Sequence, residues 1–131
     1  MTDVEILALV SKLEHCEIAP HEFHHCDHLA VSVAYLYALD FPAALEKMRT
    51  TLQRFIRHHG LKGYHETITR FWMVQVAKRL DSSLCLSEAV RQIQGEFGNK
   101  DLIYQYFSKE TLNCAAAERG WVDPDRTVKG S

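Results

Sequence analysis

Residues 22–39 read EFHHCDHLAVSVAYLYAL, and this stretch decides the fold class. Leu29, Val33 and Leu36 recur at steps of three and four, which is the spacing of a helix with one buried face. Pro20 breaks the chain just before the stretch, so we expect a helix from about residue 22 to residue 39. Several histidines occupy its first turns.

Segments with the same spacing lie on both sides of this stretch. Before it, Thr2 and Glu5 have the form of a capping box, which predicts a helix over about residues 3–15. After it, Asp40 favours a new helix start, and Gly60 supplies a terminator for that helix. Further helices are expected over about residues 64–80, 87–97 and 101–107.

Together these segments predict an all-α fold. The 131 residues fit a single domain, and the chain has neither internal repeats nor sustained strand-like alternation. Short connections favour a helical bundle of about five to six helices spanning residues 1–131. Pro124 cannot continue a helix, so a short extended C-terminal tail is expected from about residue 121.

The composition excludes several classes of partner. The 15 basic and 17 acidic side chains leave a formal net charge of −2, which does not favour nucleic acid or a membrane surface. The four cysteines form no C-x-x-C pair and are typical of free thiols in a reducing compartment. Neither a signal peptide nor a membrane span is visible, so we expect a cytoplasmic protein. Its apolar stripes also allow a homodimer.

Two of the clustered histidines share one helix face. Each helical residue advances by about 100°, so His25 and His28 lie about 60° apart and can reach the same metal ion. His24 and His28 are also compatible, through their four-residue spacing. The apolar stripe that continues through Leu29 favours His25 with His28.

His65 is the best candidate for a third ligand. It opens a stripe that continues through Thr69 and Trp72, so its ring is expected to face the interior of the bundle. A divalent ion needs at least three donors. Three imidazoles would hold a divalent transition metal ion, whether zinc, iron, nickel, copper or manganese, and would leave positions open for water or substrate.

Glu66, Asp27 and Tyr64 are the predicted catalytic residues. Glu66 and Asp27 each adjoin a candidate ligand, and carboxylates near metal-bound imidazoles orient the ring or act as general bases. Either could also ligate the ion. Tyr64 adds a hydroxyl at a helix start, where unpaired backbone N–H groups favour an anionic ligand. A small polar or anionic substrate would suit this end of the helix.

Other interpretations stay open for the histidines. His15, His21 and His58 are typical surface residues, whereas His59 is either a cation at a helix end or a fourth ligand. Buried, hydrogen-bonded histidines without metal are the alternative to the whole site. The chain contains no G-x-S-x-G, glycine-rich phosphate loop or H-E-x-x-H, which excludes the enzymes built on those motifs.

Three strings carry a resemblance to other proteins: FHHCDHL at residues 23–29, GYHETIT at residues 63–69 and WVDPD at residues 121–125. They resemble a group of small bacterial helical proteins of no known activity that share F-x-H-x-D-H-L, G-Y-H-E-T-I-T and a late W-V-x-P-D. The resemblance implies that His25, His28 and His65 are the functional histidines. Histidines at helix starts also give a weaker likeness to the DinB-like helical metalloproteins.

Two hypotheses about function follow. In the first, the chain is a metal-dependent enzyme that acts on a small polar or anionic molecule, by hydrolysis, lyase or isomerase chemistry, or oxidation. In the second, it is a non-catalytic bundle that binds a metal or small ligand for sensing or storage, or that binds another protein. An open pocket beside the three histidines would favour the enzyme.

Overall fold

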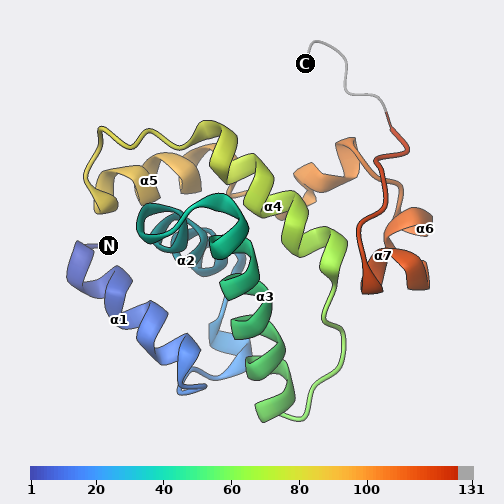
Figure 1. Ribbon diagram of the computed structural model, residues 1–131, viewed down its shortest axis with the longest axis horizontal. Coiled ribbons are helices and arrows are strands. Elements are labelled where there is room, and N and C mark those ends of the chain that lie inside the picture. Colours follow the sequence, from blue (N-terminus) through green and yellow to red (C-terminus); the bar gives the residue numbers. More distant parts are fainter. Residues whose placement is uncertain (127–131) are drawn as a thin grey trace.

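The computed structural model describes residues 1–126 as helices joined by short connections (Figure 1). Five long α-helices come first: α1 (Asp3–Glu14), α2 (His25–Ala38), α3 (Phe41–His58), α4 (Glu66–Arg79) and α5 (Leu86–Phe97). Shorter elements are the 3-10 helices η1 (Pro20–Glu22) and η2 (Lys100–Gln105), followed by α6 (Lys109–Leu112) and α7 (Ala115–Arg119). The described residues form no strand, which confirms the prediction of an all-α bundle.

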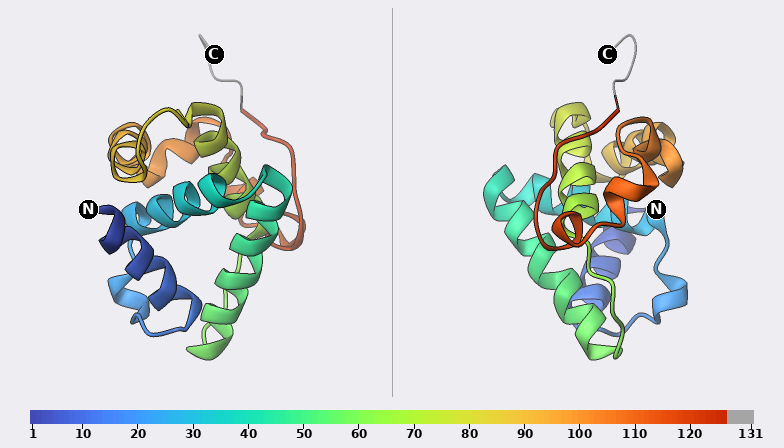
Figure 2. Two further views of the ribbon diagram at one scale, coloured as in Figure 1. Left: turned by 60° about the vertical axis from the view of Figure 1, so that its left-hand side comes forward. Right: turned by 90° about the vertical axis from the view of Figure 1, so that its right-hand side faces the viewer.

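Helix α2 forms the centre of the bundle and contacts α1, α3, α4 and α5 (Figures 1 and 2). All of residues 29–35 are buried, so this helix is covered on every side along its middle. The sequence predicted a single buried face. The burial is wider, since Ala30, Val31 and Ala34, which lie off the predicted stripe, are buried as well.

Local sequence signals set several helix ends. Thr2 and Glu5 form the predicted capping box, and the Asp40 carboxylate accepts a hydrogen bond from the backbone N–H of Ala43 at 3.0 Å. Gly60 has a φ of 67°, a left-handed conformation that glycine adopts without strain. These three signals were predicted and are confirmed.

Other boundaries differ from the prediction. Helix α2 begins at His25, because Pro20 starts a separate 3-10 turn and Phe23 is extended. Helix α4 begins at Glu66, and His65 is its N-cap residue. His65 therefore precedes the helix in which it was expected, and its side chain is half-buried there. The expected helix over residues 101–107 is the 3-10 helix η2.

The C-terminal segment runs back onto α4. Helix α7 packs against α4, and Thr67 of α4 binds the segment that follows α7. The Thr67 hydroxyl donates to the carbonyl of Gly120 at 2.7 Å and accepts from the N–H of Val122 at 3.3 Å. Residues 121–126 are non-helical, as expected, and the Trp121 ring packs edge-on against Phe107. No helix within residues 1–126 has the length and apolarity needed to cross a membrane.

Candidate functional site

His25 lies at the start of α2, and its side chain caps the C-terminal end of α5. Its Nε2 donates a hydrogen bond to the carbonyl oxygen of Phe97, the last residue of α5, at 2.8 Å. Helices leave such carbonyls without internal partners, so this bond has a structural role. The ring also packs edge-on against Trp72, with centroids 4.6 Å apart. Burial lowers the pKa of His25, and the bond to Phe97 opposes that effect.

His28 lies one turn further along α2 and has a buried ring nitrogen. Its Nε2 has no hydrogen-bond partner. Burial lowers the pKa of His28 to about 4, and the nearby His25 adds to the shift. The ring is therefore neutral at neutral pH. His25 and His28 line one cavity, as their predicted common face requires.

His65 lies outside that cavity and uses both ring nitrogens for hydrogen bonds. Nδ1 lies 3.1 Å from the backbone nitrogen of Ile68, and Nε2 lies 2.6 Å from the carbonyl oxygen of Leu112. An N–H can only donate and a carbonyl can only accept, so Nδ1 accepts and Nε2 donates. In this arrangement neither nitrogen has a lone pair free for a metal ion.

The three-histidine metal site consequently stays a prediction. Within residues 1–126 the structure forms no group of three or more histidine, cysteine, aspartate or glutamate side chains placed to hold an ion. His59, the alternative fourth ligand, packs against Phe55 with ring centroids 4.7 Å apart, and its buried Nε2 has no partner. Asp27 has a structural contact, because its carboxylate accepts from the backbone N–H of His24 at 2.9 Å.

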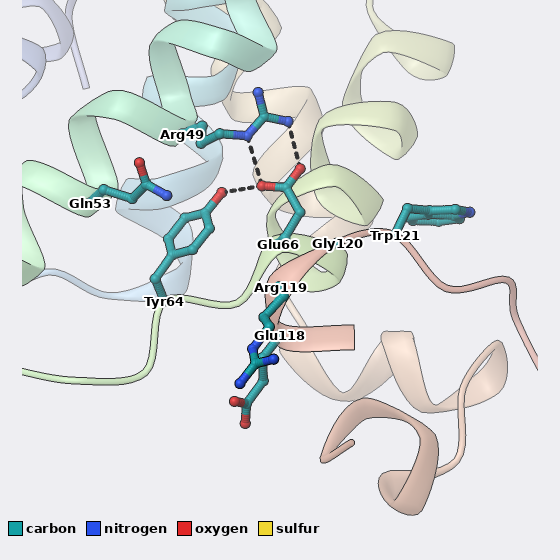
Figure 3. A pocket seen from close by; sticks show the side chains of 8 residues that line it. All are labelled: Arg49, Gln53, Tyr64, Glu66, Glu118, Arg119, Gly120 and Trp121. Atoms are coloured by element: carbon teal, nitrogen blue, oxygen red, sulfur yellow. Dashed lines mark hydrogen bonds and ion pairs between the residues drawn. The ribbon is translucent and has the colours of Figure 1, made fainter. Parts of the chain in front are cut away.

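Glu66 and Tyr64, by contrast, belong to a polar cluster that joins α3 to the start of α4 (Figure 3). Glu66 is only 7% exposed, and its carboxylate forms a bidentate ion pair with Arg49 of α3. Arg49 Nε lies 2.8 Å from one carboxylate oxygen and Nη2 lies 2.5 Å from the other. The Tyr64 hydroxyl donates to the first oxygen at 2.7 Å. Arg49 Nη1 also binds the exposed Glu46.

These contacts fix the charge states in the cluster. The hydrogen bonds from Arg49 lower the pKa of Glu66 and outweigh the effect of its burial, so the carboxylate is ionised at neutral pH. Burial, followed by the bond to Glu66, raises the pKa of Tyr64. The hydroxyl therefore stays protonated. Neither group is poised to exchange a proton near neutral pH.

A cavity of about 560 Å³ lies beside this cluster. Its walls come from α3, from the segment before α4, from α4, and from the end of α7 with the residues after it. The lining residues, drawn in Figure 3, are Arg49, Gln53, Tyr64, Glu66, Glu118, Arg119, Gly120 and Trp121. Two guanidinium groups, two carboxylates, an amide, a phenol and an indole therefore line one space. Such a mixture suits a small polar molecule.

Of the residues that line this cavity, the sequence predicted Tyr64 and Glu66 as functional but not Arg49, Gln53 or Arg119. Arg49 and Gln53 lie four residues apart and therefore share one side of α3. That spacing is visible in the sequence. It does not reveal that this side faces Glu66, because the contact depends on how α3 packs against α4.

Comparison with known proteins finds no matching family model, no matching curated protein and no matching solved structure.

Proposed function

We propose that this chain is a non-catalytic binding protein for a small polar molecule with an acidic group, held in the cavity beside Arg49 and Glu66. The main support is the ordered guanidinium of Arg49, which donates two hydrogen bonds to the carboxylate of Glu66. An arginine that is already ordered loses less side-chain entropy when it binds an anion. This proposal follows the ligand-binding alternative that the sequence left open.

The hydrogen-bond inventory leaves donors for such a ligand. A guanidinium has five N–H groups, and Arg49 directs three of them to Glu66 and Glu46. Two remain for an acidic group. Arg119 adds a second, exposed guanidinium, and the Gln53 amide can bind a hydroxyl or carbonyl of the ligand.

The charges around the cavity also limit what can bind. Arg49 and Arg119 balance Glu66 and Glu118, so the lining has no net charge. A highly charged anion would meet the two carboxylates, whereas a molecule with a single acidic group and further polar groups can use both signs. We therefore expect a singly acidic, hydrogen-bonding ligand.

The test uses lactate as an acidic probe and lactamide as its neutral counterpart, with binding followed by NMR chemical shifts of the ¹⁵N-labelled protein. We expect lactate to shift the signals of Gln53 and Trp121 saturably, and lactamide to bind roughly tenfold more weakly because it lacks the charge. Equal affinities for the two probes, or shifts confined to other parts of the chain, would contradict the proposal.

Substitution of one arginine provides the matched comparison. Arg49→Lys keeps the positive charge but removes the planar fork, so it should weaken lactate binding roughly tenfold. Arg91→Lys makes the same change at an exposed residue of α5 that does not line the cavity. This control should bind lactate as the wild type does. Loss of affinity in both variants would mean that the Arg49 fork has no specific role.

A further inference from the structure

A second cavity, of about 280 Å³, lies on another side of α4. It shares no lining residue with the cavity beside Arg49. Ile68 and Trp72 supply the α4 wall, and both lie more than 100° around the helix from Glu66 at about 100° per residue. The two cavities are therefore separate sites.

The interior of the second cavity is mostly apolar. Trp72, Ile103 and Leu112 line it and are each at most 4% exposed. Lys100 and Asp101 are exposed lining residues of opposite charge, and so mark its rim. An apolar interior with a neutral rim favours an uncharged ligand.

His28 supplies a polar group in the lining of the second cavity. It lines the cavity, and its buried Nε2 has no hydrogen-bond partner in the protein. The structure gives the His28 ring no hydrogen bond to another described group, so the imidazole is the polar group that a ligand in the cavity would meet. His25, the other imidazole in the lining, already donates through Nε2 to Phe97.

We propose that this cavity binds a neutral molecule the size of a single aromatic ring, with one hydroxyl or similar group that hydrogen-bonds the imidazole of His28. The size is sufficient, since a cavity of about 150 Å³ in an unrelated protein holds benzene. Trp72 offers an aromatic wall for such a ring. The low pKa of His28, about 4, keeps the imidazole uncharged, so the bond formed is one between neutral groups.

The experiment compares 4-fluorophenol with fluorobenzene, and ¹⁹F NMR measures both dissociation constants. A purely apolar cavity would bind fluorobenzene more tightly, because the hydroxyl of fluorophenol must leave water. We expect the reverse order in the wild type, with 4-fluorophenol binding roughly fivefold more tightly, as one added hydrogen bond predicts. Tighter binding of fluorobenzene, equal binding, or no binding of either probe would overturn the proposal.

Two variants assign the preference to one residue. His28→Phe removes the ring nitrogens, so it should restore the preference for fluorobenzene. His21→Phe makes the same chemical change at a side chain that is 83% exposed and outside the cavity, so it should keep the preference for 4-fluorophenol. A preference that survives in His28→Phe would overturn the assignment.

A measurement on the wild type covers the case in which His28→Phe does not fold. The imidazole ¹⁵N signals of His28 should shift as 4-fluorophenol is added, while those of His21 stay in place. Unchanged His28 signals at saturating probe would contradict the proposal without any variant. Binding of lactate beside Arg49 tests the other cavity, so the two proposals can fail independently.

Discussion

The Nε2 atom of His65 lies 2.6 Å from the carbonyl oxygen of Leu112, and this contact joins the start of α4 to the end of α6. The other ring nitrogen caps α4 by accepting from the N–H of Ile68. One imidazole thus satisfies two backbone groups that the helix ends leave without partners.

His65→Ala should lower the free energy of unfolding by about 2 kcal/mol, since it removes both a helix cap and a bond to a partly buried carbonyl. His65→Asn can still cap the helix but cannot reach Leu112, so its loss should be about half as large. Urea unfolding measures both. An effect below about 0.5 kcal/mol for His65→Ala would contradict the dual role.

The same variant tests the metal hypothesis. Because both His65 ring nitrogens are engaged, we expect His65→Ala to leave the metal content of untagged protein unchanged. Elemental analysis of wild type and variant gives the answer. Stoichiometric metal in the wild type that disappears in the variant would instead support the three-histidine site and the metal-dependent enzyme.

Glu66→Gln should destabilise the protein by about 1–3 kcal/mol, because it removes the negative charge and one of the two oxygens that accept from Arg49. This loss of stability is smaller than that expected for a fully buried ion pair, because the Arg49 side chain is 28% exposed. Glu46→Gln is the control. Glu46 also binds Arg49, but its side chain is 66% exposed, so its loss should stay within about 0.5 kcal/mol. Similar losses in both variants would mean that burial of Glu66 adds nothing.

His28 should make the protein less stable in mild acid. Its pKa of about 4 lies below the ordinary value of 6.5, so between these values the unfolded chain binds a proton that the folded chain does not. Stability should therefore fall as the pH drops from about 6.5 towards 4, by at most about 3 kcal/mol from this residue. His25, whose pKa is also lowered, acts in the same direction.

Urea unfolding of the wild type at about pH 7 and about pH 4.5 measures this decline. His28→Phe cannot bind the proton, so its stability should fall less over the same range. His21→Phe should follow the wild type, since that histidine is exposed. Equal pH dependence in the wild type and His28→Phe would contradict the prediction.

Trp72→Ala should cost about 3–5 kcal/mol, because Trp72 is 2% exposed and packs against Phe71 and Phe97. Trp121→Ala removes the same side chain at a position that is 36% exposed, so its cost should be about 1–2 kcal/mol. Thermal or urea unfolding ranks the two. A cost for Trp121→Ala equal to or above that for Trp72→Ala would show that the core is misassigned.

The sequence predicted those parts of the molecule that depend on neighbours along the chain. Thr2, Asp40 and Gly60 act on residues within a few positions, so their effects on helix ends were foreseeable. His65 was misplaced because a histidine before a helix and a histidine on its first turn look alike in sequence, and histidine is not among the preferred capping residues.

The polar cluster could be predicted only in part for a related reason. Tyr64 and Glu66 lie two positions apart in the chain and were identified together. Arg49 reaches Glu66 through the packing of α3 on α4, across 17 positions of sequence. The unpaired ring nitrogen of His28 was equally hidden, since it depends on which groups the packed helices place around that ring.

The walls of the cavity beside Arg49 arrive at different times during synthesis. The five long helices are complete once residue 97 has been added, but Glu118, Arg119 and Trp121 complete the cavity only later. In the order of synthesis, the five long helices therefore precede the residues that close one side of the cavity. Any ligand at this site would touch both the long helices and the residues at the end of α7, and would hold the C-terminal segment against α4.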